Sequence, residues 1–300
     1  MLQSRPDPPR PHFLCIGAQK AATSWLHSAF QQCDDIWVPP IKELHYWDRL
    51  DRKQHEQGDG VTGQTLYKKN RSRYARNLRR VLKIIGSGNI SAAKFYYEFL
   101  YRKRSDDWYR ELFPSTARIA GEVTPGYAPL SGETISRIVT MNGDIRIIYL
   151  IRNPIDRAWS AYRYRKTREQ TWEPSLDDFS LFLQTPFVQS HGNYMQNIET
   201  WTTHIQPGNM FVGFYDAVYE QPETLLRTLC EFLGARTLAS LPKRRNVSLD
   251  AEFPANFRDI AFEQYQPELA RLSRRFPGYP EDWARGSLIS KGNHPVSYIL

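Results

Sequence analysis

Short apolar runs alternate with stretches of helical periodicity along most of this chain of 300 residues. Strands that alternate with helices favour a parallel sheet covered by helices on both faces. The run IRIIYLI has few polar breaks and is the candidate central strand. The pattern therefore predicts an α/β protein with three α/β/α layers and a mainly parallel sheet. Strands are expected at 13–16, 36–38, 118–125, 145–151 and 210–215, and helices at 25–30, 106–113, 135–141, 154–168, 194–205 and 222–234.

Two segments depart from this alternation. Residues 1–11 contain four prolines and no apolar periodicity, which predicts a flexible arm ahead of a single domain at 12–300. Residues 61–97 contain basic side chains and no acidic ones, with apolar residues near helical spacing. We interpret this stretch as a basic amphipathic helix within an insertion at about 50–105.

Charge and cysteine content narrow the class of protein. The chain has 40 Lys and Arg against 32 Asp and Glu, a net charge of +8 that favours anionic partners without choosing among them. Cys15, Cys33 and Cys230 are widely spaced, so neither a zinc site nor a disulfide framework is indicated. With no signal peptide and no membrane span in the sequence, we expect a soluble cytoplasmic protein; the alternative is a lumenal domain without its anchor.

The loop GAQKAATS at 17–24 follows the first apolar run and leads into a helix, which is the arrangement of a phosphate-binding turn. In Walker A loops the lysine is seventh from the opening glycine, whereas Lys20 is fourth here. Backbone N–H groups, Lys20 and the hydroxyls of Thr23 and Ser24 nevertheless make a good anion site. The sequence therefore predicts that this loop binds a phosphate.

Two further stretches follow predicted strands, where ligands bind in parallel sheets. KELHYWD supplies Lys42, Glu43 and His45, and IRNPIDRAWSAY supplies Arg152 and, eight residues later, Ser160. A P-loop phosphotransferase usually has an acidic residue for Mg²⁺ at a strand end. An arginine in that place suits a second phosphate instead. The two loops together predict a nucleotide with phosphates at both its 5′ and 3′ ends.

These motifs resemble the sulfotransferases that use 3′-phosphoadenosine 5′-phosphosulfate (PAPS), in particular the heparan-sulfate-type and bacterial branch. GAQKAATS is similar to their 5′-phosphosulfate loop, R-N-P-x-x-R-x-x-S-x-Y to their 3′-phosphate motif, and KELHYWD to their K-E-x-H-F-F-D segment. WYRELF, GEVTPGY and GNYMQNIETW resemble weaker landmarks in the same order. The resemblance implies a P-loop-like sulfotransferase fold and transfer of a sulfuryl group from PAPS to an acceptor hydroxyl.

The resemblance also implies a role for each matching residue. The 3′-phosphate would contact Arg152 and Ser160, and no metal is required. The acceptor would be a small molecule or a glycan, with no nucleic acid expected, and the oligomeric state is left open. The 5′-phosphosulfate would lie against Lys20, Ala21, Ala22, Thr23, Ser24 and Trp25, and the run KRRN, with Arg244, Arg245 and Asn246, would close over the nucleotide.

Two departures from the family pattern raise separate questions. Ala21 and Ala22 stand where the family often has glycine, which requires negative φ angles at both. Val123 stands where heparan-sulfate enzymes usually carry a lysine, which weighs against a glycosaminoglycan acceptor.

The general base has two candidates on one stretch. Glu43 and His45 would face the same way if the stretch is extended. The resemblance favours Glu43, while the ordinary pKa of histidine favours His45. Two functions of other classes stay open: a P-loop nucleotide phosphotransferase, and a non-catalytic protein that binds an anionic polymer.

Overall fold

The computed structural model describes residues 9–56, 90–169, 174–236, 253–286 and 294–300. The run with Arg244, Arg245 and Asn246, most of the predicted basic helix and residues 1–8 of the arm lie outside them. Pro11, the last residue of the predicted arm, is buried, and its carbonyl accepts a hydrogen bond from Asn142. The end of the predicted arm therefore packs against the domain at Pro11.

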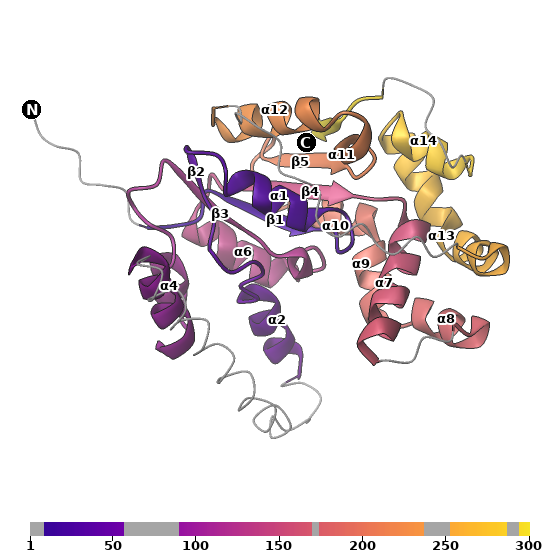
Figure 1. Ribbon diagram of the computed structural model, residues 1–300, viewed down its shortest axis with the longest axis horizontal. Helices are drawn as coiled ribbons and strands as arrows, with labels where there is room; N and C mark the ends of the chain where they lie inside the picture. The colour runs from indigo at the N-terminus through magenta and orange to yellow at the C-terminus, as the bar shows by residue number, and fades with distance from the viewer. Residues whose placement is uncertain (1–8, 57–89, 170–173, 237–252, 287–293) are drawn as a thin grey trace, which may run out of the picture.

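A six-stranded sheet forms the centre of the molecule (Figure 1). Its strand order is β2-β3-β1-β4-β5-β6, and every pairing is parallel except that of β5 with β6. In register, Cys15 of β1 lies opposite Val123 of β3 on one side and Ile148 of β4 on the other. The strands are β1 (Phe13–Gly17), β2 (Ile36–Trp37), β3 (Ile119–Val123), β4 (Arg146–Ile151), β5 (Met210–Phe214) and β6 (Ser297–Ile299).

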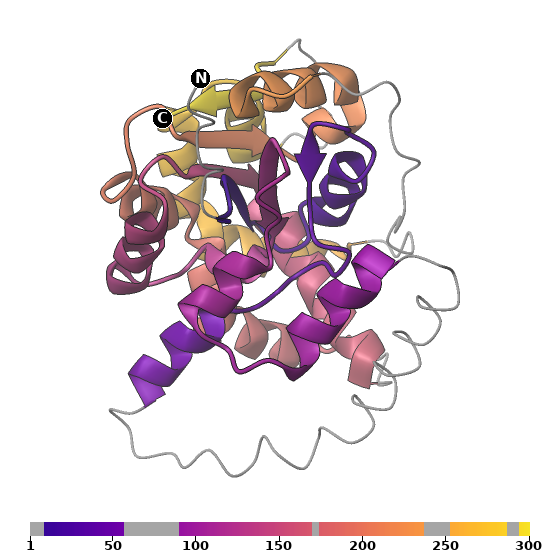
Figure 2. The ribbon, with the colours of Figure 1, turned by 90° about the vertical axis from the view of Figure 1, so that its left-hand side faces the viewer.

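Helices cover both faces of this sheet, as Figures 1 and 2 show: α1 and α12 lie on one face, and α6 and α10 on the other. The prediction of a mainly parallel α/β/α sandwich is therefore confirmed. The helices are α1 (Thr23–Phe30), α2 (Trp47–Glu56), α4 (Ile90–Tyr101), α5 (Asp106–Glu111), α6 (Gly132–Met141), α7 (Pro154–Glu169), α8 (Leu176–Leu183), α9 (Pro186–Gly192), α10 (Tyr194–Thr202), α11 (Ala217–Glu220), α12 (Pro222–Leu233), α13 (Ala255–Arg275) and α14 (Tyr279–Ala284), with a 3₁₀ turn η1 (Pro125–Tyr127).

The strands are buried because both faces are covered. Every residue of β1, β3 and β5 is buried, and β4 is exposed only in part at its first residue, Arg146. Fully apolar strands such as IIYLI are what a two-sided core requires. The central position predicted for β4 is confirmed by its pairing with both β1 and β5.

Local signals placed several helix ends correctly. Pro154 begins α7, and Gly234 ends α12 in the left-handed conformation with a φ of 75°, which glycine adopts without strain. The C-terminal part of the fold was not predicted: α13 continues through Pro267, and β6 adds an antiparallel edge strand beside β5. A proline usually ends or kinks a helix, so the sequence pattern does not indicate α13 as one element.

Candidate active site

The loop between β1 and α1 presents the first turn of a helix without a capping side chain. Ala22 occupies the N-cap position of α1, and no side chain accepts a hydrogen bond from the first-turn N–H groups there. Alanine is a poor N-cap residue, because its side chain cannot satisfy those donors. An anion at this helix end would satisfy them and would be favoured by the helix dipole.

Backbone strain in the molecule is concentrated in two stretches. Among the described residues, the non-glycine residues with positive φ are Lys20 (67°), Ala22 (59°), Glu43 (67°) and His45 (51°). The expected negative φ is therefore wrong at Ala22, and the segment of Glu43 and His45 is not an extended strand. The left-handed region costs a non-glycine residue about 1–2 kcal/mol. Such strain persists where surrounding contacts enforce it, most often at functional sites.

Arg152 joins the end of β4 to this first loop. Its Nη1 donates a hydrogen bond of 3.2 Å to the carbonyl oxygen of Lys20. Its guanidinium also stacks over the ring of Tyr215, 4.3 Å from the ring centroid, at the end of β5. Because β1 and β4 are neighbouring parallel strands, their carboxyl ends bring Lys20 and Arg152 together as predicted.

The charges near Lys20 are mostly positive. Burial lowers the pKa of the Lys20 ammonium, and the charges of Arg152, Arg163 and Lys42 lower it further. Within the described part of the chain, neither Lys20 nor Arg152 forms an ion pair with a carboxylate. The Lys20 Nζ instead lies 4.5 Å from the centroid of the Tyr164 ring, on α7. A site that crowds cations in this way is poised for an anionic ligand.

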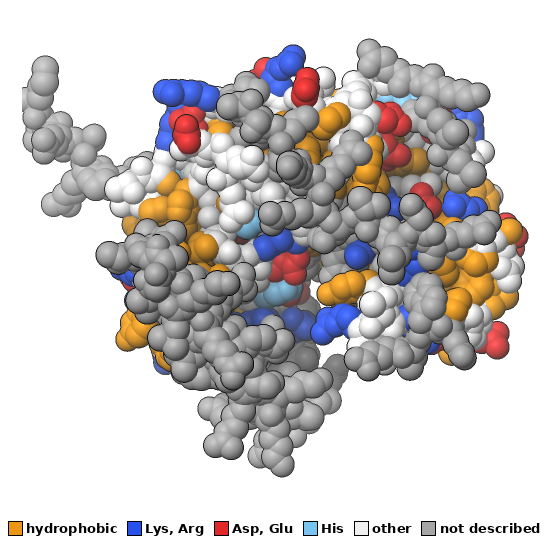
Figure 3. Space-filling model, viewed as in Figure 1, with side chains coloured by type: hydrophobic (Ala, Val, Ile, Leu, Met, Phe, Trp, Pro, Cys, Tyr) orange, Lys and Arg blue, Asp and Glu red, His pale blue; other side chains and the backbone are white. Residues whose placement is uncertain are grey.

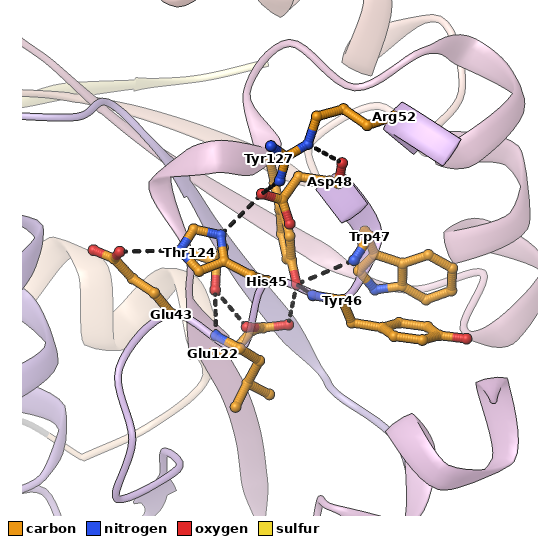
Figure 4. Close-up of polar contacts among 10 residues, drawn as sticks. Glu43, His45, Tyr46, Trp47, Asp48, Arg52, Glu122, Thr124 and Tyr127 are labelled. Carbon is orange, nitrogen blue, oxygen red and sulfur yellow. Dashed lines mark hydrogen bonds and ion pairs between the residues drawn. The ribbon is translucent and has the colours of Figure 1, made fainter. Parts of the chain in front are cut away.

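A chain of charges occupies the other side of the site. His45 Nε2 lies 3.3 Å from Glu43 Oε2, and His45 Nδ1 lies 2.9 Å from Asp48 Oδ2. The hydrogen bonds to Asp48 and Glu43 raise the pKa of His45 to about 9, against the effect of burial. Burial would raise the pKa of Glu43, but the hydrogen bond from His45 and the charge of Lys42 hold it at about 2. His45 is thus the cation between two carboxylates (Figure 4).

A buried carboxylate fixes the backbone of this stretch. Glu122, at the end of β3, accepts hydrogen bonds from the hydroxyls of Tyr109, Thr124 and Tyr127. In turn, Thr124 Oγ1 accepts from the N–H of Leu44 at 3.1 Å, and the Tyr127 hydroxyl accepts from the N–H of Tyr46 at 3.0 Å. Figure 4 shows dashed lines from Glu122 to Thr124 and to Tyr127, next to the segment that carries Glu43 and His45.

This network explains how the strained stretch keeps its shape. Burial raises the pKa of Glu122 to about 6 although its hydrogen bonds oppose the rise. Burial of the Glu122 carboxylate is unfavourable, and the three hydroxyl donors offset part of that cost. Two of these hydroxyls in turn hold the backbone at Leu44 and Tyr46.

The two sets of residues follow neighbouring strands. Lys20 and Arg152 come after β1 and β4, and the Glu43 N–H donates to the carbonyl oxygen of Val123 at the end of β3. Figure 3 shows a hollow where α2 and α7 lie in Figure 1, with Lys, Arg, acidic and His side chains at its edge. We name Lys20, Arg152 and Ser160 the donor wall, and Glu43, His45 and Asp48 the acid wall. On the donor wall, the cations have no carboxylate partner among the described residues. On the acid wall, the Glu43 carboxylate is paired with Lys42 and His45.

Comparison with known proteins identifies this arrangement. Residues 11–238 match the family described as "Sulfotransferase family". The chain belongs to the sulfotransferase family. The match includes the donor wall and the acid wall, and it begins at Pro11.

Individual sulfotransferases are distant relatives. The chain is 27% identical over 161 residues to mouse heparan sulfate glucosamine 3-O-sulfotransferase 3B1, covering 50% of this chain and 40% of that protein. It is 24% identical over 129 residues to guinea pig 3-alpha-hydroxysteroid sulfotransferase, covering 38% and 44%. The matches thus span less than half the length of these relatives. A sulfotransferase structure from Alicyclobacillus acidocaldarius shares the fold, with a TM-score of 0.63 and 23% identity over 89% of this chain and 95% of that one.

The residues predicted for the donor site differ in burial and in the use of their backbone N–H groups. Ala21 is fully buried, and Trp25 has 6% exposure. The Ala21 N–H donates to Ala18 O and the Trp25 N–H to Ala22 O, so both are used within the chain. Thr23 is buried, Ser24 is exposed, and Ser160 is buried on α7.

Other residues of the candidate site were not predicted from the sequence. Asp48 lies three residues after His45 in the motif, so its spacing was an available signal. Glu122 and Tyr127 lie within GEVTPGY, a stretch whose pattern assigns no role to either side chain. Tyr164 and Tyr215 carried no sequence signal, because their contacts depend on how α7 and β5 approach the loop.

Three further findings concern metals, membrane spans and cysteines. Within the described ranges, no group of three or more His, Cys, Asp or Glu side chains is arranged to hold a metal ion. The described helices include none that is both long and apolar enough to cross a membrane. Cys15, Cys33 and Cys230 are buried and form no disulfide.

Proposed function

We propose that this sulfotransferase moves a sulfuryl group from PAPS directly to an acceptor hydroxyl, in line. One observation carries the proposal: the cationic donor wall and Glu43 follow the carboxyl ends of the neighbouring strands β1, β4 and β3. The cations of the donor wall would be balanced by an anionic ligand. Glu43 would accept a proton from the acceptor.

The donor wall fits a nucleotide with two separated anionic groups. The uncapped end of α1 and the Lys20 ammonium would hold the 5′-phosphosulfate, and Arg152 with Ser160 would hold the 3′-phosphate. Arg244, Arg245 and Asn246 remain part of the proposed site by resemblance. When bound, the donor supplies the sulfuryl group and leaves as 3′-phosphoadenosine 5′-phosphate (PAP).

The proposed chemistry divides between two residues. Glu43 takes the proton of the acceptor hydroxyl as the acceptor oxygen bonds to sulfur and the bond from sulfur to the phosphate oxygen breaks. The Lys20 ammonium stabilises the negative charge left on that phosphate. His45, with a pKa of about 9, is protonated at neutral pH; it therefore orients Glu43 and is not itself the base.

For the acceptor, we propose a hydroxyl of a carbohydrate or of a small molecule. The names of the mouse and guinea pig relatives point to hydroxyl acceptors of these two kinds. Val123 is fully buried in β3, so it places no cation in the hollow. This substitution favours an acceptor with less negative charge than a glycosaminoglycan.

Ligand-induced stabilisation tests the donor. We expect PAP to raise the melting temperature in EDTA, because a ligand at about a hundred times its Kd stabilises the fold by about 2.7 kcal/mol. Mg-ATP and Mg-GTP should have much smaller effects. Differential scanning calorimetry decides the matter; an equal or larger effect of Mg-GTP would favour a P-loop phosphotransferase instead.

A further inference from the structure

Both carboxylate oxygens of Glu43 are engaged by the chain itself. Lys42 Nζ contacts Oε1, and His45 Nε2 lies 3.3 Å from Oε2. A carboxylate that holds two cations is a weak proton acceptor, in agreement with its pKa of about 2. The proposed base is therefore blocked in the protein without its donor.

Lys42 pairs with Glu43 of the acid wall, and its charge also acts on residues around the loop at 17–24. Its charge acts on Lys20 of the loop, on Cys15 of β1 and on His27 of α1. The backbone next to it is fixed, since the Glu43 N–H donates to the carbonyl oxygen of Val123 at 3.2 Å. The ammonium itself sits on a flexible four-carbon stem. It can change partner while the backbone stays in place.

Lys42 is also the less firmly held of the two cations on Glu43. His45 is tied on its far side to Asp48, which in turn pairs with Arg52 at 3.4 Å. In the parts of the chain that the structure covers, the ion pair found for Lys42 is the one with Glu43. A competing anion would therefore draw away Lys42 before His45.

We infer that Lys42 is a donor-responsive latch: an anionic phosphosulfate bound at the Lys20 loop draws the Lys42 ammonium away from Glu43 and frees one carboxylate oxygen to receive the acceptor proton. The inference rests on the proposed function. The ammonium exchanges one anionic partner for another. The base thus becomes competent only after the donor has bound.

The pKa of Glu43, measured by carbon-detected NMR on the full chain with labelled glutamate, tests the latch. Glu43→Gln assigns the signal. In the wild type, saturating PAP should raise the pKa of Glu43 by about one pH unit or more. In Lys42→Gln the pKa should already be raised without PAP, and PAP should add little. The groups that face Glu43 are Lys42 and His45, with Asp48 behind His45.

Control variants separate the latch from simple repulsion by the bound anion. Lys42→Arg keeps the charge and should keep the response to PAP. Lys94→Gln, at an exposed position of α4, should leave both pKa values as in the wild type. Repulsion alone would raise the pKa of Glu43 equally in the wild type and in Lys42→Gln, which would overturn the latch.

Failure of the latch and failure of the proposed function have different outcomes. If PAP stabilises the fold but leaves the pKa of Glu43 unchanged, the latch is wrong and the donor assignment stands. If PAP does not bind at all, the donor assignment fails and the latch fails with it. Circular dichroism of each variant establishes that the chain is folded before it is titrated.

Discussion

The donor wall and the acid wall hold their charges in opposite ways. On the donor wall, Lys20 and Arg152 have no carboxylate partner among the described residues, and burial together with neighbouring cations lowers the pKa of Lys20. On the acid wall, each charge is matched: Glu43 by Lys42 and His45, and Asp48 by His45 and Arg52. The donor wall therefore favours an anionic ligand, whereas the charges of the acid wall are paired with one another.

This difference has a physical cause. Crowded cations destabilise the empty protein, and a bound anion relieves that cost, so part of the affinity for the ligand is stored in the fold. A base left unpaired beside those cations would attract them and close the anion site. Pairing Glu43 within its own segment keeps the two functions separate.

The largest effect should come from the acid wall. Glu43→Gln keeps the shape of the side chain but cannot accept a proton, so turnover should fall by about 10² to 10⁴. Donor affinity should change little. Single-turnover rates together with calorimetry of PAP binding measure both. His45→Asn should cost less, and the reverse order of the two variants would make His45 the base.

On the donor wall, Arg152→Ala should remove the preference for a 3′-phosphate. A charge-assisted hydrogen bond contributes about 1.5–3 kcal/mol, so affinity for PAP should fall about 10- to 150-fold. Affinity for the analogue without the 3′-phosphate should hardly change. Calorimetry with both ligands checks this; an unchanged ratio of the two affinities would place the 3′-phosphate elsewhere.

The donor wall was the more predictable of the two from sequence. The position of Lys20 in its loop and of Arg152 after an apolar strand follow from local patterns, and parallel pairing of β1 with β4 brings them together. Helix ends at Pro154 and Gly234 likewise depend on the residue itself.

The shape of the acid wall was not predictable in the same way. Positive φ at Glu43 has no local signal, and at His45 the signal is weak, because positive φ is uncommon even for histidine. The conformation is imposed by contacts distant in sequence, such as the bond from the Tyr46 N–H to Tyr127, 81 residues away. The prediction of a negative φ at Ala22 failed for the same reason, because its φ of 59° is set by the loop around it.

Protonation of His45 should make activity depend on pH through the acid wall. The pKa of His45 is raised to about 9, so its ion pairs are fully formed below about 6.5 and are lost as the pH rises through about 9. If the protonated form orients Glu43, activity should fall along that same alkaline limb. Asp48→Asn removes the first cause of the raised pKa and should move the limb to lower pH by about one to two units.

Proton NMR of His45 and the pH profile of turnover should shift together in Asp48→Asn. The matched control is Asp107→Asn, at an exposed position of α5, which should leave both unchanged. An alkaline limb that stays in place while the pKa of His45 falls would show that His45 does not govern the reaction.

The smallest effect is expected for the contact between the Lys20 ammonium and the Tyr164 ring. Its ammonium rests 4.5 Å from the Tyr164 ring centroid, and Tyr164 is 54% exposed, so the contact should contribute about 0.5–1 kcal/mol. Tyr164→Leu removes the ring and should lower kcat about two- to fivefold at saturating donor. Tyr164→Phe keeps the ring face and should restore the rate, whereas Tyr97→Leu on α4 should have no effect. If Tyr164→Phe loses as much as Tyr164→Leu, the hydroxyl and not the ring is what matters, and Lys20 is not held by this contact.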